Sequence, residues 1–300
     1  MSPSRRLRDG AERALFARGI WIRNPDESRH RSLERFDLPD RIARQRDSSD
    51  PYRFVVPTER ITTPYGFSFG GWHPYTETLA QAERTNDFSY DRSLLHRFHA
   101  RFQPRSLADA TLVRPDAPEV RSLADLPHSW EVLRDIWFLP RRKLTMRPTG
   151  DRIDDGLLRS PHVGPMPDGM ARSTHARLIE TYESILDHGY DPDRFDGARK
   201  SSFDGYAADG YFLWHRGSYR FVVLHGHHRI GAARHLGVEE VRVRIRRRYV
   251  PVVQEPDLER FHITSIVGVD AMQRVFLDLV STDGWEKARR WGLIEGASGS

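Results

Sequence analysis

Three histidines and one arginine surround a single glycine in the segment His225-Gly-His-His-Arg229. The apolar residues before it predict a strand, and HHRIGAARHL after it predicts a short helix. Gly226 allows a sharp turn that a side chain would obstruct. The backbone N–H groups of His227, His228 and Arg229 would then open the helix, where they have no intrahelical acceptors and lie at the positive end of the helix dipole. This pattern predicts a phosphate site with Arg229 as its charged partner.

Two other interpretations of the same segment stay open. His225 and His227 are separated by one residue, a spacing that can bind zinc or iron. However, His228 would point elsewhere, a further ligand would have to come from a distant segment, and Arg229 would repel a dication. Alternatively, the histidines only satisfy local backbone groups. We expect the anion site and no metal site.

The composition narrows the classes of protein. The chain has 300 residues and no cysteine, which excludes disulfides, thiolate nucleophiles and zinc–thiolate centres. A net charge of +5 does not by itself establish nucleic-acid binding. No segment has the ~18 apolar residues of a membrane helix, and the N-terminal residues lack the apolar block of a secretory signal. A cytoplasmic protein without a membrane partner is the simplest expectation.

Along the chain, the patterns predict five regions. Strands are expected at 52–57, 211–214, 219–225 and 240–246, and helices at 76–85, 93–102, 129–139, 176–188 and 270–280, with Ser173 or Thr174 as the N-cap of the fourth helix. The regions are a charged leader (1–50), a first strand with a helical insertion (51–146), a linker (147–172), a core (173–250) and a C-terminal helical extension (251–300).

Four motifs follow one another in the core: Ser184-Ile185 with His188-Gly189, Gly226 to Arg229 with Ala232-Ala233, Leu236-Gly237, and the strand Val241–Ile245. In their order and spacing, these motifs resemble the ParB/sulfiredoxin superfamily. This resemblance implies an α/β (α+β) fold with a small mixed sheet, to which N-terminal and C-terminal helices are added. The outer segments also look like uncharacterised ParB-like proteins that accompany polysaccharide-modifying enzymes.

The resemblance implies a nucleotide at the glycine turn. Gly226, His228 and Arg229 resemble the phosphate-binding residues of sulfiredoxins, whereas His227 stands where those enzymes have their catalytic cysteine, so sulfinic-acid reduction is not expected. On the preceding helix, Arg177, Glu180 and Ser184 share one face and resemble nucleotide contacts, although the glutamate departs from the pattern. The implied activity is ATP-dependent phosphoryl transfer, assisted by Mg²⁺, to a small hydroxylated acceptor that the sequence does not identify. His227 and His228 are its candidate catalytic residues.

A different class of function remains as the alternative. The chain shows neither the second phosphate motif of CTP-dependent ParB proteins nor a helix-turn-helix pattern after residue 250, so DNA partitioning is not favoured. A non-catalytic module that binds nucleic acid or CTP is still possible, and the arginines of 242–248 motivate it. Nuclease activity is a weaker third option. We expect packing or surface roles for the remaining polar candidates, which are Glu59, His96 and His99, while His73 and Glu77 lie near the first strand without a matching motif.

Overall fold

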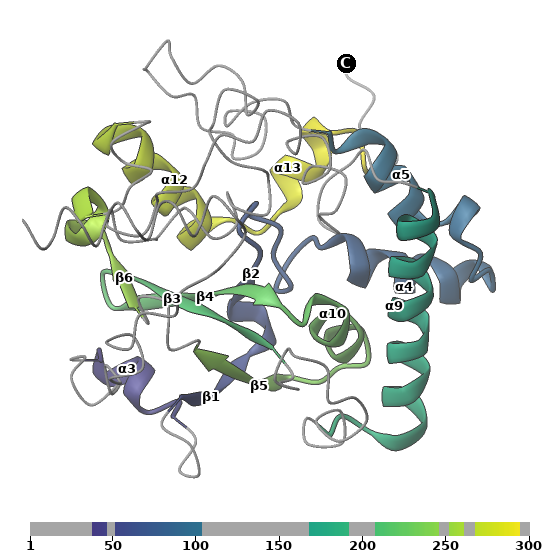
Figure 1. The fold of residues 1–300 in the computed structure, drawn as a ribbon, viewed down its shortest axis with the longest axis horizontal. Helices are drawn as coiled ribbons and strands as arrows, with labels where there is room; N and C mark the ends of the chain where they lie inside the picture. The colour runs from purple at the N-terminus through teal and green to yellow at the C-terminus, as the bar shows by residue number, and fades with distance from the viewer. Residues whose placement is uncertain are drawn as a thin grey trace, which may run out of the picture.

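The computed structural model describes residues 38–46, 52–103, 168–191, 208–245, 252–260 and 268–294. The helix expected at 129–139 and the arginine run 246–248 lie outside these ranges. In the described part, helices gather around one mixed sheet, which confirms the predicted α/β class (Figure 1). The regional boundaries inferred from the sequence stay predictions.

The sheet contains six strands, and five of them follow the order β1-β5-β3-β4-β2. Neighbours are antiparallel in the pairs β1–β5 and β3–β4 and parallel in β5–β3 and β4–β2, while β6 pairs in parallel with β3. The strands are β1 (Arg53–Pro57), β2 (Ile61–Thr62), β3 (Asp209–His215), β4 (Ser218–His225), β5 (Glu240–Ile245) and β6 (Val252–Gln254).

The two strands expected at 211–214 and 219–225 are present as β3 and β4, and they form a hairpin. Arg216 and Gly217 connect the strands, and both have positive φ angles, 46° and 80°, as the two central residues of a type I′ turn require. In β5, every second side chain is buried, as the alternation of apolar and charged residues in EVRVRI indicates: Val241, Val243 and Ile245 face the core.

The sheet must be strongly curled, because β1 and β2 are at opposite ends of the strand order. Only a 3-10 turn, η2 (Thr58–Arg60), separates them in the chain. Four Cα steps reach at most ~14 Å, whereas four strand spacings in a flat sheet span ~19 Å. The sheet therefore bends until its two edges approach each other.

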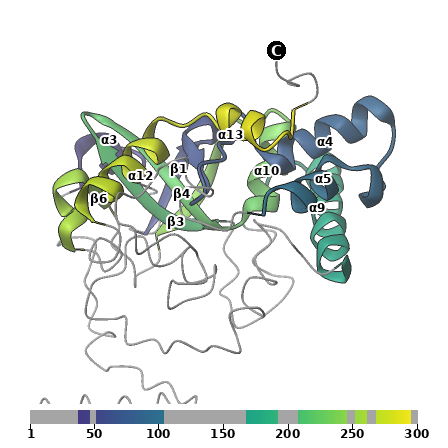
Figure 2. The ribbon, with the colours of Figure 1, turned by 90° about the horizontal axis from the view of Figure 1, so that it is seen from above.

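Four helices lie together at one end of the sheet (Figures 1 and 2). The short helix α10 contacts both α9 and α4, and α5 contacts α4 and α9. Ser93 accepts a hydrogen bond from the backbone N–H of His96 and so caps α5. These helices are α4 (Pro74–Thr85), α5 (Leu94–Arg101), α9 (Asp168–His188) and α10 (His227–His235).

The remaining described helices are α3 (Asp40–Ala43), α12 (Val269–Ser281) and α13 (Trp285–Arg290), with 3-10 segments at η3 (Tyr90–Arg92) and η7 (Glu255–Arg260). Arg220 of β4 joins α12 to the sheet: its guanidinium donates to the backbone carbonyls of Glu59, Val280 and Thr282. No helix in the described ranges has the length and apolar character that crossing a membrane demands.

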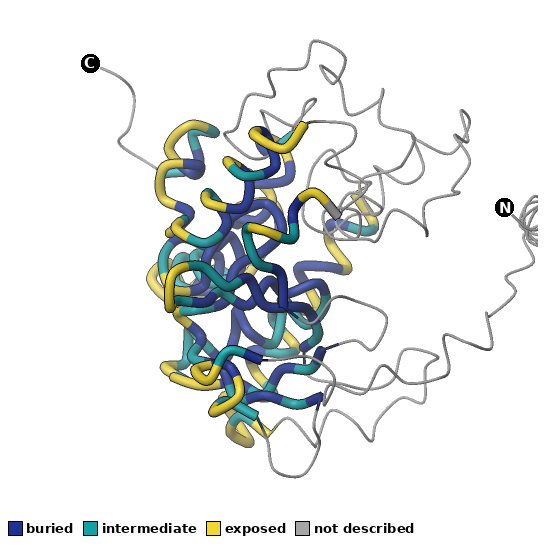
Figure 3. Tube along the Cα trace, turned by 90° about the vertical axis from the view of Figure 1, so that its left-hand side faces the viewer, coloured by how far each residue is buried: buried dark blue, intermediate teal, exposed yellow. Residues whose placement is uncertain are grey.

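One continuous hydrophobic core fills the space between the sheet and the helices, and the buried parts of the chain run through its centre (Figure 3). Its largest fully buried side chains include many from the loop of residues 63–73. That loop is inserted between the sheet, α5 and α13 rather than exposed. The fully buried side chains are Trp72, Tyr65, Tyr75, Tyr219, Phe54, Phe67, Phe69, Phe98, Phe102, Phe212 and Phe221.

The expected start of α9 was wrong. The helix begins at Asp168, inside the predicted linker, and Ser173 and Thr174 lie within it rather than at its N-cap. An ion pair of 2.8 Å between Arg172 and Asp168 and a bidentate one between Arg172 and Asp91 stabilise this first turn. Because Asp91 is far from Arg172 in the sequence, a local sequence pattern does not indicate this contact or the helix start that it stabilises.

Candidate functional site

The glycine turn is a strand-to-helix connection, as predicted. β4 ends at His225, Gly226 adopts a left-handed conformation with φ 94° and ψ 13°, and α10 begins at His227. Gly226 has no side chain to cap the helix. As at any helix start, the first backbone N–H groups of α10 have no acceptor within the helix, and such groups favour anions.

Of the two candidate catalytic histidines, His227 is buried and His228 is half-buried. His227 is only 3% exposed, and both nitrogens of its ring are buried. His228 stacks on Tyr75 of α4, with ring centroids 4.8 Å apart and an interplanar angle of 14°. Its ring also hydrogen-bonds the backbone of Thr174 on α9. His228 therefore ties α10 to its two neighbouring helices.

The environment of His228 keeps its ring neutral. Burial, together with the charges of Arg177 and Arg229, lowers its pKa to about 3. Its Nε2 is buried and has no hydrogen-bond partner among the described residues. Because the ring donates to Thr174 through its other nitrogen, Nε2 carries the lone pair. His228 consequently presents no N–H group to a phosphate.

The arginines are better placed for a ligand than the histidines. Arg177 is exposed on α9, and its charge acts on both His228 and Tyr75. Arg229 is partly exposed and lies near Tyr190, whose pKa is raised to about 12 by burial in spite of the opposing effect of Arg229. Two guanidinium groups from different helices therefore act on His228, in the first turn of α10.

Ser184 is not brought to the same place. It lies seven residues, or about 10 Å, beyond Arg177 along α9. It is half-buried, and its backbone carbonyl accepts a hydrogen bond from the ring of His188. Glu180, between the two, is exposed. The structure thus gathers Gly226, Arg229 and Arg177, and leaves Ser184 two turns away.

His73 is a residue of this region to which the sequence assigned no role. Its Nδ1 accepts a hydrogen bond from the backbone N–H of Tyr75 and so caps α4, and its ring stacks on Phe69 at 3.7 Å. Burial lowers its pKa well below the ordinary value, and the charge of His228 contributes. Because Nδ1 accepts, the neutral ring carries its proton on Nε2. His73 therefore cannot bind a metal through Nε2 while it caps the helix.

The cavity beside His73 is too small for a nucleotide. It has a volume of about 10 Å³, which is at the limit for one water molecule. Its walls are mainly aromatic, and Nε2 of His73 is buried without a partner among the described residues. The lining residues are Thr63, Tyr65, Phe67, His73, Pro74, Tyr75 and Phe98.

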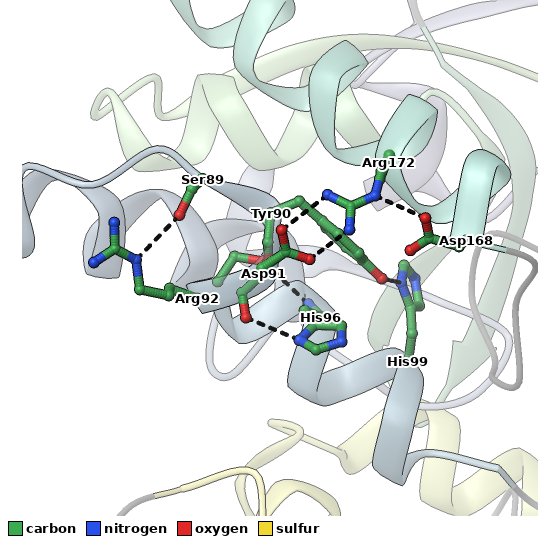
Figure 4. Close-up of polar contacts among 9 residues, drawn as sticks. Ser89, Tyr90, Asp91, Arg92, His96, His99, Asp168 and Arg172 are labelled. Atoms are coloured by element: carbon green, nitrogen blue, oxygen red, sulfur yellow. Dashed lines mark hydrogen bonds and ion pairs between the residues drawn. The ribbon is translucent and has the colours of Figure 1, made fainter.

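The second histidine group, His96 and His99, surrounds a tyrosine rather than a metal (Figure 4). The ring of His99 is hydrogen-bonded to the hydroxyl of Tyr90 at 3.4 Å, and that of His96 to the backbone carbonyl of Asp91 at 3.0 Å. The guanidinium of Arg172 lies 5.3 Å above the ring of Tyr90. Within the described ranges, no three His, Asp or Glu side chains form a group that could hold a metal ion.

The chain matches no protein-family model, and no curated protein or solved structure is significantly similar to it. The likeness to the ParB/sulfiredoxin superfamily stays a prediction that depends on the motifs. What the coordinates add is the geometry at the start of α10, namely a left-handed glycine followed by a helix that arginines flank.

Proposed function

We propose that the start of α10 binds the phosphates of a nucleotide, and that this nucleotide is ATP. One observation carries the proposal: Gly226, in a left-handed conformation, opens α10 without a side-chain cap, while the charges of Arg229 and Arg177 both act on His228 in its first turn. Guanidinium groups and helix N-termini both favour phosphate oxygens. The choice of ATP rests on the resemblance of the motif to sulfiredoxins.

Phosphoryl transfer to a small hydroxylated acceptor is the activity that we propose for this site. Mg²⁺ would enter with the nucleotide, coordinated chiefly by phosphate oxygens and water, and would neutralise their charge. Arg229 and the first N–H groups of α10 would hold the phosphates in place. Because both ring nitrogens of His227 and Nε2 of His228 are buried, we assign these histidines to the support of α10 and leave the proton-accepting group unassigned.

Calorimetric titration with MgATP tests the binding step. We expect Arg229→Ala to weaken binding about tenfold or more, the effect of losing one charge-assisted contact of about 1.5–3 kcal/mol. Arg289→Ala is the matched control, because Arg289 is exposed on α13. Equal affinities of the wild type and Arg229→Ala would overturn the proposal, provided that both proteins melt cooperatively.

Titration with MgCTP and a transfer assay separate the possible activities. Stronger binding of CTP than of ATP would favour a ParB-like regulatory module. Consumption of ATP, followed by ³¹P NMR with free serine or simple sugars present, would support transfer. Binding without consumption would leave a nucleotide-binding module and reject the enzymatic part for those acceptors.

One observation favours nucleic-acid binding as a second candidate. Arg53 of β1 is the cross-strand partner of Arg244 of β5. Arg242 lies on the same face of the sheet as Arg244, and the buried valines of β5 lie on the other face. A strip of arginines suits a phosphate backbone. Binding of RNA or DNA whose affinity falls steeply with salt would support this reading, and no binding at low salt would reject it.

A further inference from the structure

Three polar side chains from three helices meet at the far end of α10. The hydroxyl of Tyr182 on α9 donates to Oε1 of Glu83 on α4 at 2.5 Å, and Nε2 of His235 on α10 lies 3.0 Å from Oε2 of the same carboxylate. We call Glu83, Tyr182 and His235 the helix clamp. The carboxylate of Glu83 is its centre, because each of its oxygens contacts a different helix.

The hydrogen bond at the centre of the clamp shifts the pKa of both its partners, Glu83 and Tyr182. The hydroxyl of Tyr182 holds the pKa of Glu83 below its ordinary value, and the carboxylate raises the pKa of Tyr182 to about 12. Both shifts favour an ionised Glu83 that accepts from a protonated tyrosine. The ring of Tyr182 also packs 5.8 Å from that of His235, so the clamp combines packing with polar contacts.

The helix clamp and the proposed phosphate site lie at opposite ends of the same helix contact. On α10, His235 is seven residues, ~10 Å, from His228, and on α9, Tyr182 is five residues, ~7.5 Å, from Arg177. At the other end, His228 joins α10 to Thr174 and Tyr75. Two polar connections, one at each end, thus join α9 to α10.

Arg177 lies between these two connections and is itself exposed. We infer that Glu83 is a positioning residue for the proposed phosphate site, because it fixes α9 against α10 and so holds Arg177 beside the first turn of α10. This inference rests on the proposed function. Glu83 itself touches no ligand in this arrangement; it acts through Arg177.

A double-mutant cycle for MgATP binding tests the inference. We expect Glu83→Ala to weaken binding about fivefold, which corresponds to ~1 kcal/mol, and Glu83→Gln, which keeps an acceptor for Tyr182, to recover part of this loss. In the background of Arg177→Ala, Glu83→Ala should change the affinity no further. A purely structural role would instead weaken binding to the same extent in both backgrounds.

The control is Glu183→Gln, which removes the same charge beside Tyr182 from an exposed position on α9. A second cycle, measured by urea unfolding without ligand, pairs Glu83→Ala with Tyr182→Phe and should be non-additive. Additive unfolding energies would show that the clamp does not couple the helices and would overturn the inference. Normal MgATP binding by Glu83→Ala would overturn it while the proposed function stands. Failure of the wild type to bind would end both.

Discussion

Nζ of Lys287 lies 3.5 Å from the carboxylate of Asp278, and the lysine is fully buried. Its ammonium group also donates to the backbone carbonyl of Tyr65 and lies 5.9 Å from the ring of Phe67. Burial lowers the pKa of Lys287 and raises that of Asp278, and each charge opposes the shift of the other. Helix α13 is thereby attached to the loop of residues 63–73.

Removing either Lys287 or Asp278 should destabilise the folded protein. Lys287→Ala leaves a carboxylate that is largely buried and uncompensated, so we expect the free energy of unfolding to fall by about 3–5 kcal/mol. Urea denaturation followed by tryptophan fluorescence measures it. The double variant Lys287→Met with Asp278→Leu should recover most of the loss. A double variant as unstable as Lys287→Ala alone would contradict this account.

The conformation of Gly226 gives a second prediction. At φ 94°, a residue with a side chain is strained, so Gly226→Ala should lower the free energy of unfolding by about 1–2 kcal/mol. Gly169→Ala is the control. Gly169 lies in α9 with open space around it, and alanine there should stabilise the protein by about 0.5–1 kcal/mol. Thermal melts of both variants decide the matter; a stabilised Gly226→Ala would show that the turn is not left-handed.

A third prediction concerns the contact of α10 with α4. A Cβ atom at Gly231 would lie 2.9 Å from Cβ of Tyr75, a distance that forces the two helices apart. Although alanine favours helices, we expect Gly231→Ala to cost about 1–3 kcal/mol because the core is overpacked. Chemical denaturation tests this, and a gain in stability would indicate that α4 and α10 are less closely packed.

The neutral ring of His228 predicts how stability depends on pH. Its pKa is about 3 in the folded protein, against ~6.5 when unfolded. Between these values the unfolded chain binds more protons, so the free energy of unfolding falls as the pH falls below 6.5. The contribution of His228 between pH 6.5 and 5 is about 1.5 kcal/mol.

His228→Gln should flatten this dependence, and the measurement is urea denaturation at several pH values. His73 acts in the same direction, because its pKa is also lowered, so part of the slope should remain in the variant. Parallel curves for the wild type and His228→Gln would mean that the ring of His228 is not buried in the folded state.

Local patterns predicted the elements whose signals are local. The strands expected at 211–214, 219–225 and 240–246 each follow from residues a few positions apart, and all three are present. The start of α9 was missed because Arg172 binds Asp91, 81 residues away. Helix α13, whose buried lysine a sequence pattern would place in solvent, was not predicted either.

The site was predicted only in part. The glycine turn follows from residue types, because a glycine between a strand and a helix limits the backbone choices. The inward position of His228 does not follow from them. It depends on Tyr75 and Thr174, which come from two other helices. Residue type alone cannot distinguish an imidazole that contacts a ligand from one that packs between helices.

The short 3-10 turn between β1 and β2 connects strands at the two rims of the curled sheet. The backbone of this turn joins the two rims. The N–H of Thr58 donates to the carbonyl of Glu239 beside one rim, and the carbonyl of Glu59 accepts from Arg220 of the strand beside the other. Moving the chain termini into this turn by circular permutation would release both rims at once. The fold thus depends on an unbroken chain at three residues that belong to no strand.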